Sequence, residues 1–174
     1  MAPTIHSPTH PTTTDRKQTR LEQARSALES VTDPEIPVLT IADLGVLRDV
    51  RLDGDVIEVT ITPTYSGCPA MTVIALDIEI ALAGLGPVRV RTVLSPAWTT
   101  DWMTGEGRRK LLAYGIAPPP PASGRGALFG RPIPACPRCG STATEMISAF
   151  GSTACKALHR CQACREPFDA FKCL

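Results

Sequence analysis

The seven cysteines are the residues of this 174-residue chain best suited to chemistry. Four of them form two Cys-x-x-Cys pairs, Cys136 with Cys139 and Cys161 with Cys164, with 21 residues between the pairs. Two intervening residues let one turn direct both sulfurs at a single ion. A closed set of four thiolates is the common structural zinc site, so these cysteines predict a tetrahedral site for zinc.

The other two cysteines of the C-terminal part, Cys155 and Cys173, lie outside these pairs. Three interpretations remain open for them. They can be small buried side chains or spare thiols near the metal, or a second thiol pair for redox chemistry or transient iron binding. Either one can also replace a member of the four predicted ligands. The sequence does not choose among these interpretations.

Cys68 is the only cysteine of the N-terminal part, and Pro69 after it favours the first turn of a helix. Free backbone N–H groups and the helix dipole stabilise an anion there, so we expect a lowered thiol pKa, with raised reactivity and metal affinity. Carboxylates of Asp33, Glu35 and Asp43 are candidates to gather near it. The alternative is a buried cysteine that serves as a small apolar side chain.

Bulk composition narrows the class of protein. Hydrophobic residues make up 43% and charged residues 20%, with a net charge of +1, as in an ordinary globular protein. No apolar run is long enough to span a bilayer, and the N-terminus has no secretory signal pattern. We therefore expect a cytoplasmic protein with reduced thiols and no membrane partner.

Nucleic acid is an obvious partner to consider for a zinc ribbon, but the charge pattern argues against it. The basic residues of this part alternate with acidic ones and have no aromatic stacking platform beside them. We therefore expect no nucleic-acid partner. The basic residues concerned are Arg138, Lys156, Arg160, Arg165 and Lys172.

Periodicity predicts the elements of the first half. Residues 15–31 carry apolar side chains at helical spacing, and residues 34–45, with two prolines, suggest an extended loop. Alternating runs at 46–52 and 56–62 flank Asp53-Gly54, which is a strong hairpin signal. These features predict one helix followed by a two-stranded hairpin.

The next elements complete a domain. A helix beginning at Pro69 and running to residue 83 is apolar nearly all round, so we expect it to be substantially buried. Residues 88–94 suggest a third strand with Leu94 facing the core, and residues 100–114 a short helix that Gly115 ends. The fold class is therefore α+β, with a small sheet of three or so strands packed with helices.

Composition also suggests the boundaries along the chain. We expect a disordered tail at 1–14, the α+β domain at 15–117, a proline- and glycine-rich linker at 118–134 and a small zinc-ribbon module at 135–174. Because this module has few apolar residues, metal binding would supply most of its stability, roughly 10–16 kcal/mol in small zinc peptides.

Several motifs carry a family resemblance. The runs Asp33-Pro34-Glu35-Ile36-Pro37, Asp43-Leu44-Gly45 and Ser66-Gly67-Cys68-Pro69 resemble the small iron–sulfur-assembly domain shared by SufT-like proteins and cytosolic iron–sulfur targeting factors. Residues 94–102 and 115–119 fit the same domain. Residues 150–156 and 166–173 are similar to the PaaD family, the D proteins of bacterial phenylacetyl-CoA epoxidase systems. One departure is Arg165, where such metal knuckles often have glycine, as at Gly140.

This resemblance implies an accessory or maturation role in aerobic phenylacetate catabolism, assisting iron–sulfur cluster or di-iron assembly. It implies structural zinc, with transient iron or a cluster handled by Cys68, Asp33 and Glu35. The implied partners are the oxygenase and reductase components of the epoxidase, together with iron–sulfur carrier proteins. The alternative is a non-catalytic structural or coupling subunit within the complex. We see no residue set for catalysis by this chain alone.

Overall fold

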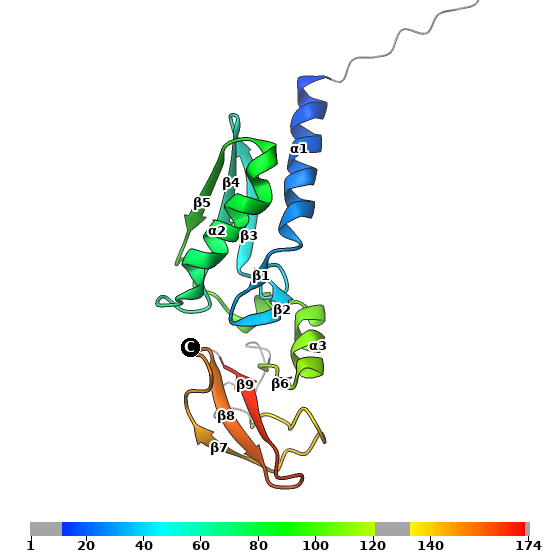
Figure 1. Ribbon diagram of the computed structural model, residues 1–174, viewed down its shortest axis with the longest axis vertical. Helices are drawn as coiled ribbons and strands as arrows, with labels where there is room; N and C mark the ends of the chain where they lie inside the picture. The colour runs from blue at the N-terminus through cyan, green and yellow to red at the C-terminus, as the bar shows by residue number, and fades with distance from the viewer. Residues whose placement is uncertain (1–11, 121–132, 173–174) are drawn as a thin grey trace, which may run out of the picture.

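The computed structural model describes residues 12–120 and 133–172 (Figure 1). Most of the predicted tail and linker, as well as Cys173, lie outside these residues. An N-terminal module, residues 12–120, contains the helices α1 (Thr13–Leu28), α2 (Ala70–Leu82) and α3 (Gly105–Tyr114), and a C-terminal module, residues 133–172, carries three strands. None of the helices in the described ranges is long and apolar enough to cross a membrane.

A three-stranded sheet in the order β3-β4-β5 forms the centre of the N-terminal module. Strands β3 (Leu47–Asp53) and β4 (Val56–Ile61) are an antiparallel hairpin, while β5 (Val88–Thr92) pairs parallel with β4. Helix α2 (Ala70–Leu82) and the short 3-10 turn η1 (Ala83–Leu85) connect β4 to β5. The predicted α+β class, the hairpin and the third strand are confirmed.

Helices α1 (Thr13–Leu28) and α2 pack against the same face of this sheet (Figure 1). A capping box between Thr12 and Asp15 fixes the start of α1. Alternation along β4 directs Ile57, Val59 and Ile61 toward the helices, where none of the three side chains is exposed. The core therefore lies between one helical layer and one sheet layer.

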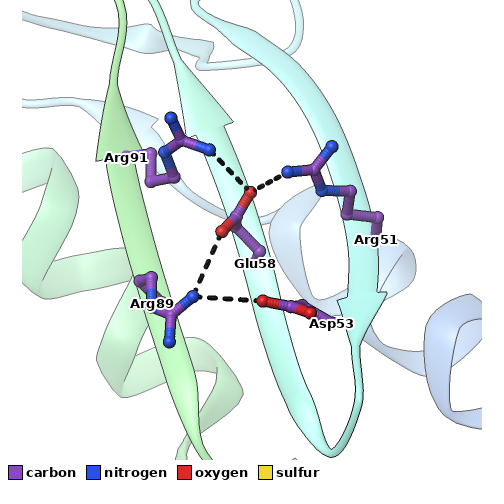
Figure 2. Close-up of polar contacts among 5 residues, drawn as sticks. All are labelled: Arg51, Asp53, Glu58, Arg89 and Arg91. Atoms are coloured by element: carbon purple, nitrogen blue, oxygen red, sulfur yellow. Dashed lines mark hydrogen bonds and ion pairs between the residues drawn. The ribbon is translucent and has the colours of Figure 1, made fainter.

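The opposite face of the sheet carries charged side chains instead of helices (Figure 2). The Glu58 carboxylate, with a 3% exposed side chain, pairs with Arg51, and with Arg91 and Arg89 at 3.3 and 3.4 Å. Burial raises the pKa of Glu58, but hydrogen bonds from Arg51 and Arg91 outweigh it and hold the pKa below its usual value. These paired charges cover this face of the sheet in place of a second helical layer.

A small hairpin replaces the predicted loop at 34–45. Strand β1 (Thr32–Asp33) pairs with β2 (Ile36–Thr40), so the loop prediction is wrong there. Asp33 Oδ1 accepts hydrogen bonds from the backbone N–H groups of Glu35 and Ile36, both at 2.8 Å. This Asx-type turn reverses the chain at Pro34 and fixes the position of Glu35.

Two burial predictions are also wrong. Helix α2 buries one face, but the apolar side chains Val73, Leu76 and Ile80 on its other faces are 44%, 55% and 64% exposed. The reason is that the sheet and α1 cover α2 from one side only. Strand β5 ends at Thr92, and Leu94 beyond it is 58% exposed rather than directed into the core.

The predicted helix at 100–114 is divided in two. A 3-10 turn, η2 (Thr100–Trp102), precedes α3 (Gly105–Tyr114), whose N-cap is Thr104. The prediction that Gly115 ends the helix is confirmed by its left-handed φ of 88°.

The chain then enters a second, four-stranded sheet in the order β6-β9-β8-β7. Strand β6 (Ile116–Ala117) pairs parallel with β9 (Pro167–Phe171), and β8 (Lys156–Cys161) lies between β9 and β7 (Thr144–Ser148). This sheet lies next to β1, β2 and α3, on the side away from the β3-β4-β5 sheet (Figure 1). Because β6 belongs to the N-terminal part of the chain, the two modules share a sheet.

Gly45 has a close contact that gives a stability prediction. Its φ is +69°, and a Cβ there would overlap the backbone oxygen and Cβ of Trp102. Gly45→Ala should therefore cost about 3 kcal/mol of unfolding free energy, from strain plus overpacking. Gly54→Ala is the matched control, since its φ is +62° with open space around it, and it should cost only about 1 kcal/mol. Urea unfolding of both variants measures the difference, and equal costs would contradict the packing argument.

Candidate metal sites

The two Cys-x-x-Cys pairs converge on one point in the C-terminal module. The sulfurs of Cys136, Cys139, Cys161 and Cys164 all lie within 4.8 Å of one another. The Cys136–Cys164 and Cys139–Cys161 sulfur separations are 3.7 and 3.5 Å. A tetrahedral ion with bonds of about 2.3 Å requires sulfurs about 3.8 Å apart. The arrangement thus fits zinc, which would join the two turns as a cross-link.

Both pairs lie in turns of the same shape. Gly140 N–H donates to the Cys136 carbonyl at 2.8 Å, and Arg165 N–H donates to the Cys161 carbonyl at 3.0 Å. Their φ values are 73° and 68°, so Arg165 adopts the left-handed conformation that Gly140 adopts in the first turn. The departure at Arg165 therefore leaves the turn intact, at the cost of a strained backbone.

This strain predicts a stabilising substitution. Arg165→Gly should raise the unfolding free energy of the zinc-loaded protein by about 1 kcal/mol, because glycine has no Cβ to clash in this conformation. Arg138→Gly, in the first turn at a position without positive φ, is the control and should not stabilise. Thermal unfolding at saturating zinc measures both. A less stable Arg165→Gly protein would contradict the interpretation.

Local backbone groups also prepare one sulfur for metal binding. The Cys164 N–H lies 3.5 Å from the Cys161 sulfur. This hydrogen bond is the main cause that lowers the pKa of Cys161 to about 6. A thiolate is the form that binds metal, so the turn favours the required ionisation.

Cys68 lies directly before α2, as predicted, but its predicted pKa shift is wrong. Burial raises the pKa of Cys68 and outweighs the backbone N–H groups of Ala70 and Met71, which lower it. The carboxylates of Glu35 and Asp33 add to the rise. The helix start is therefore oriented toward the sulfur, yet without a cation the thiol stays protonated at neutral pH.

The carboxylates of the first hairpin divide into two groups. Glu35 and Asp33 lie close enough to Cys68 to act on its charge. Asp43 is engaged elsewhere, since it pairs with Lys110 at 2.6 Å and accepts the Thr40 N–H at 3.1 Å. The structure thus brings together two of the three carboxylates considered for Cys68.

Cys155 approaches the same carboxylates from the C-terminal module. Its thiol donates to Glu35 Oε2 at 3.7 Å, and the side chain is only 5% exposed. Burial raises the pKa of Cys155 to about 11, with further contributions from the charges of Glu35 and Asp33. A thiol of the C-terminal module therefore contacts Glu35, the glutamate whose charge also acts on Cys68. Sequence patterns do not predict this meeting, because 120 residues separate Cys155 from Glu35.

Lys156 and Tyr65 also belong to the surroundings of Glu35 and the two thiols. Sequence patterns did not predict either of them as a site residue. The buried Lys156 Nζ lies 3.5 Å from the Glu35 carbonyl and 4.0 Å from Asp169 Oδ2. Burial, followed by the charges of Cys68, Glu35 and Cys155, raises the pKa of Tyr65. No spacing signal marks either residue, since their role depends on how the modules meet.

His159 does not join the four-cysteine group and is not on the surface. It is 9% exposed and stacks on Phe168 with ring centroids 5.6 Å apart. Within the described residues its Nδ1 has no hydrogen-bond partner.

Comparison with known families agrees with both halves of the structure. The iron–sulfur cluster assembly protein family matches residues 21–95, and the PaaD zinc beta ribbon domain matches residues 121–172. A solved domain of unknown function from Bacillus anthracis is similar at 27% identity and a TM-score of 0.51, covering 55% of this chain and 93% of that one. Fold and cysteine site together define an iron–sulfur assembly domain extended by a zinc ribbon.

Curated relatives narrow this class. An Escherichia coli K12 protein, provisionally named as the D component of 1,2-phenylacetyl-CoA epoxidase, is 53% identical over 84% of this chain and 89% of its own length. An iron–sulfur protein maturation auxiliary factor of Bacillus subtilis is 39% identical over 55% of this chain and 93% of its own. The chain belongs to the PaaD family, the D components of phenylacetyl-CoA epoxidase systems.

Proposed function

We propose that this chain is a cytoplasmic maturation factor for a phenylacetyl-CoA epoxidase system. It assists assembly of the iron–sulfur cluster of the reductase, or of the di-iron centre of the oxygenase. The observation that carries the proposal is the thiol and carboxylate group around Cys68 and Glu35, within a domain of the iron–sulfur assembly family. Thiolate and carboxylate together are donors suited to ferrous iron.

The residues of this group have distinct tasks in the proposal. Cys68 and Glu35 bind the iron or a cluster iron, while Asp33 holds the turn that positions Glu35. The nearby carboxylates attract a cation, and a bound cation in turn releases the thiol proton to the solvent. Because the Cys68 thiol is protonated without metal, protons compete with the cation for the sulfur. Binding of the cation is therefore reversible, as its delivery to a client protein requires.

The C-terminal module has a structural task. We propose that Cys136, Cys139, Cys161 and Cys164 bind zinc, and that the zinc-ordered sheet contacts the oxygenase or reductase client. Zinc in a closed four-thiolate site is redox-inert and supplies folding energy rather than catalysis. The proposal therefore separates a permanent ion from a labile one.

Co-expression with the epoxidase tests the function. Cells that produce the oxygenase, the reductase and a Cys68→Ser form should yield reductase with at least severalfold less cluster and correspondingly little activity. Ser66→Ala, an exposed neighbour outside the proposed site, is the matched control and should behave as wild type. Full cluster content with Cys68→Ser would refute the maturation role.

A second candidate is a stable non-catalytic subunit that couples parts of the complex. The name of the Escherichia coli relative, which calls it a subunit, favours this alternative. Adding the purified chain to fully matured oxygenase and reductase separates the two. A maturation factor leaves turnover unchanged, whereas a coupling subunit raises it and co-purifies at a fixed ratio.

A further inference from the structure

We propose that Cys155 of the C-terminal module is a ligand, together with Cys68 and Glu35, of a labile divalent-metal site at the junction of the two modules. This inference rests on the proposed function and extends it, since the ribbon module then completes the iron site as well as contacting a client. The ion is of the borderline class that accepts both thiolate and carboxylate, with ferrous iron as the physiological candidate.

The geometry at the junction suits a shared ion. Cys155 Sγ and Glu35 Oε2 are 3.7 Å apart. Two ligands at tetrahedral angles on one ion, with bonds of about 2.3 Å to sulfur and about 2.1 Å to oxygen, lie about 3.6 Å apart. The pair can therefore bind one ion with almost no movement. Cys68, at the start of α2, responds to the same Glu35 charge but does not form a three-residue metal-binding group with this pair in the structure. Its side chain must therefore turn toward the pair when the ion binds.

The charges at the junction also favour a cation. Glu35 and Asp33 both act on Cys68 and on Cys155, and the cation that partly offsets them at Cys155 is Lys156, which is occupied by Asp169 and the Glu35 carbonyl. Two thiols placed beside carboxylates repel one another once ionised, unless a cation lies between them. Binding one divalent ion would release two thiol protons to the buffer, so the net charge of the group would stay unchanged.

The segment before β8 holds Cys155 firmly in place. The Cys155 carbonyl accepts the Lys172 N–H at 3.0 Å, and its sulfur contacts Thr153 Oγ1 at 3.1 Å. Gly151, where a Cβ would crowd Asp169 Oδ1, lets the loop close against β9.

Metal titration tests the inference on the full, zinc-loaded chain under anaerobic conditions. Co²⁺ is the probe, because thiolate ligation gives it a charge-transfer absorption. Wild type should bind one Co²⁺ beyond the zinc, and Cys155→Ser and Glu35→Gln should each weaken this binding by at least about 100-fold, more than an outer-shell change. Glu29→Gln, an exposed carboxylate variant of the same module as Glu35, is the matched control and should bind as wild type.

X-ray absorption at the cobalt edge keeps the test decisive if a variant fails to fold. Wild type should show two sulfur ligands at the second site. A single sulfur, unchanged affinity in a folded Cys155→Ser protein, or no second ion would overturn the inference. If Cys155 is a ligand but cells with Cys68→Ser mature the reductase normally, the proposed function fails and the metal site stands. If Cys68 is required for maturation while Cys155 is not a ligand, only this inference fails.

Discussion

Removal of zinc should unfold the C-terminal module while the β3-β4-β5 sheet and α2 stay folded. The small core of the module consists of four buried residues together with Ala117 of β6, and two of the four, Cys136 and Cys161, are proposed zinc ligands. Without the ion, the remaining apolar contacts cannot offset the entropy of ordering the strands. Zinc binding contributes roughly 10–16 kcal/mol to such modules. The N-terminal module has its own, much larger core.

Hydrogen exchange with mass spectrometry measures this outcome segment by segment. After chelation, the amides of β7, β8 and β9 should exchange within the first time points, and those of β4 and α2 should remain protected. Cys161→Ser should reproduce the pattern without a chelator. Protected β7–β9 amides in metal-free protein would show that the module folds without zinc.

Phe171→Ala should separate the two modules, with a loss of about 3–5 kcal/mol of unfolding free energy. Phe171, at the end of β9, is 4% exposed and packs in the core of the N-terminal module, 6.0 Å from the Trp98 ring. Trp98 is itself held by a hydrogen bond from Nε1 to the Leu44 carbonyl at 2.9 Å. A truncated side chain would leave a cavity between the modules that neither can close alone.

Phe150→Ala is the matched control for this substitution. Phe150 belongs to the same module but is 65% exposed, and its ring contacts only the Lys172 ammonium among the ring interactions of the described residues. Its removal should cost less than about 1 kcal/mol. Chemical denaturation of both variants gives the comparison. If Phe171→Ala and Phe150→Ala cost the same, the junction is not the well-packed core described here.

The sequence predicts best where a signal is local. Asp53-Gly54 marks the β3–β4 hairpin, and alternation along β4 identifies its buried face. The spacing of the four cysteines identifies the metal site from the sequence alone. Each of these features is set by residues a few positions apart or by a fixed chemical requirement. They were correctly predicted for that reason.

The predictions fail where distant parts of the chain decide the outcome. The burial of α2 depends on how many elements cover it, and the sheet and α1 cover it from one side only, which leaves Val73, Leu76 and Ile80 exposed. The β1–β2 hairpin depends on the Asp33 side chain bonding two N–H groups. The meeting of Cys155 with Glu35 depends on the docking of the modules, which leaves no periodic trace in the sequence.

The thiols of this one chain are proposed to bind metal in two different ways. A closed set of four sulfurs holds a permanent ion that orders the ribbon. We propose that a mixed thiol and carboxylate group near α2 holds a labile one, and that the packing of Phe171 and Cys155 against the N-terminal module links the two. Loss of the first ion should therefore weaken the second site as well.

Metal content per chain, measured by elemental analysis on protein purified without oxygen, tests this division most directly. Wild type should contain one zinc together with iron, and Cys68→Ser should keep the zinc and lose the iron. Wild-type protein that folds without zinc, or iron content that is the same with and without the Cys68 thiol, would contradict the proposed division.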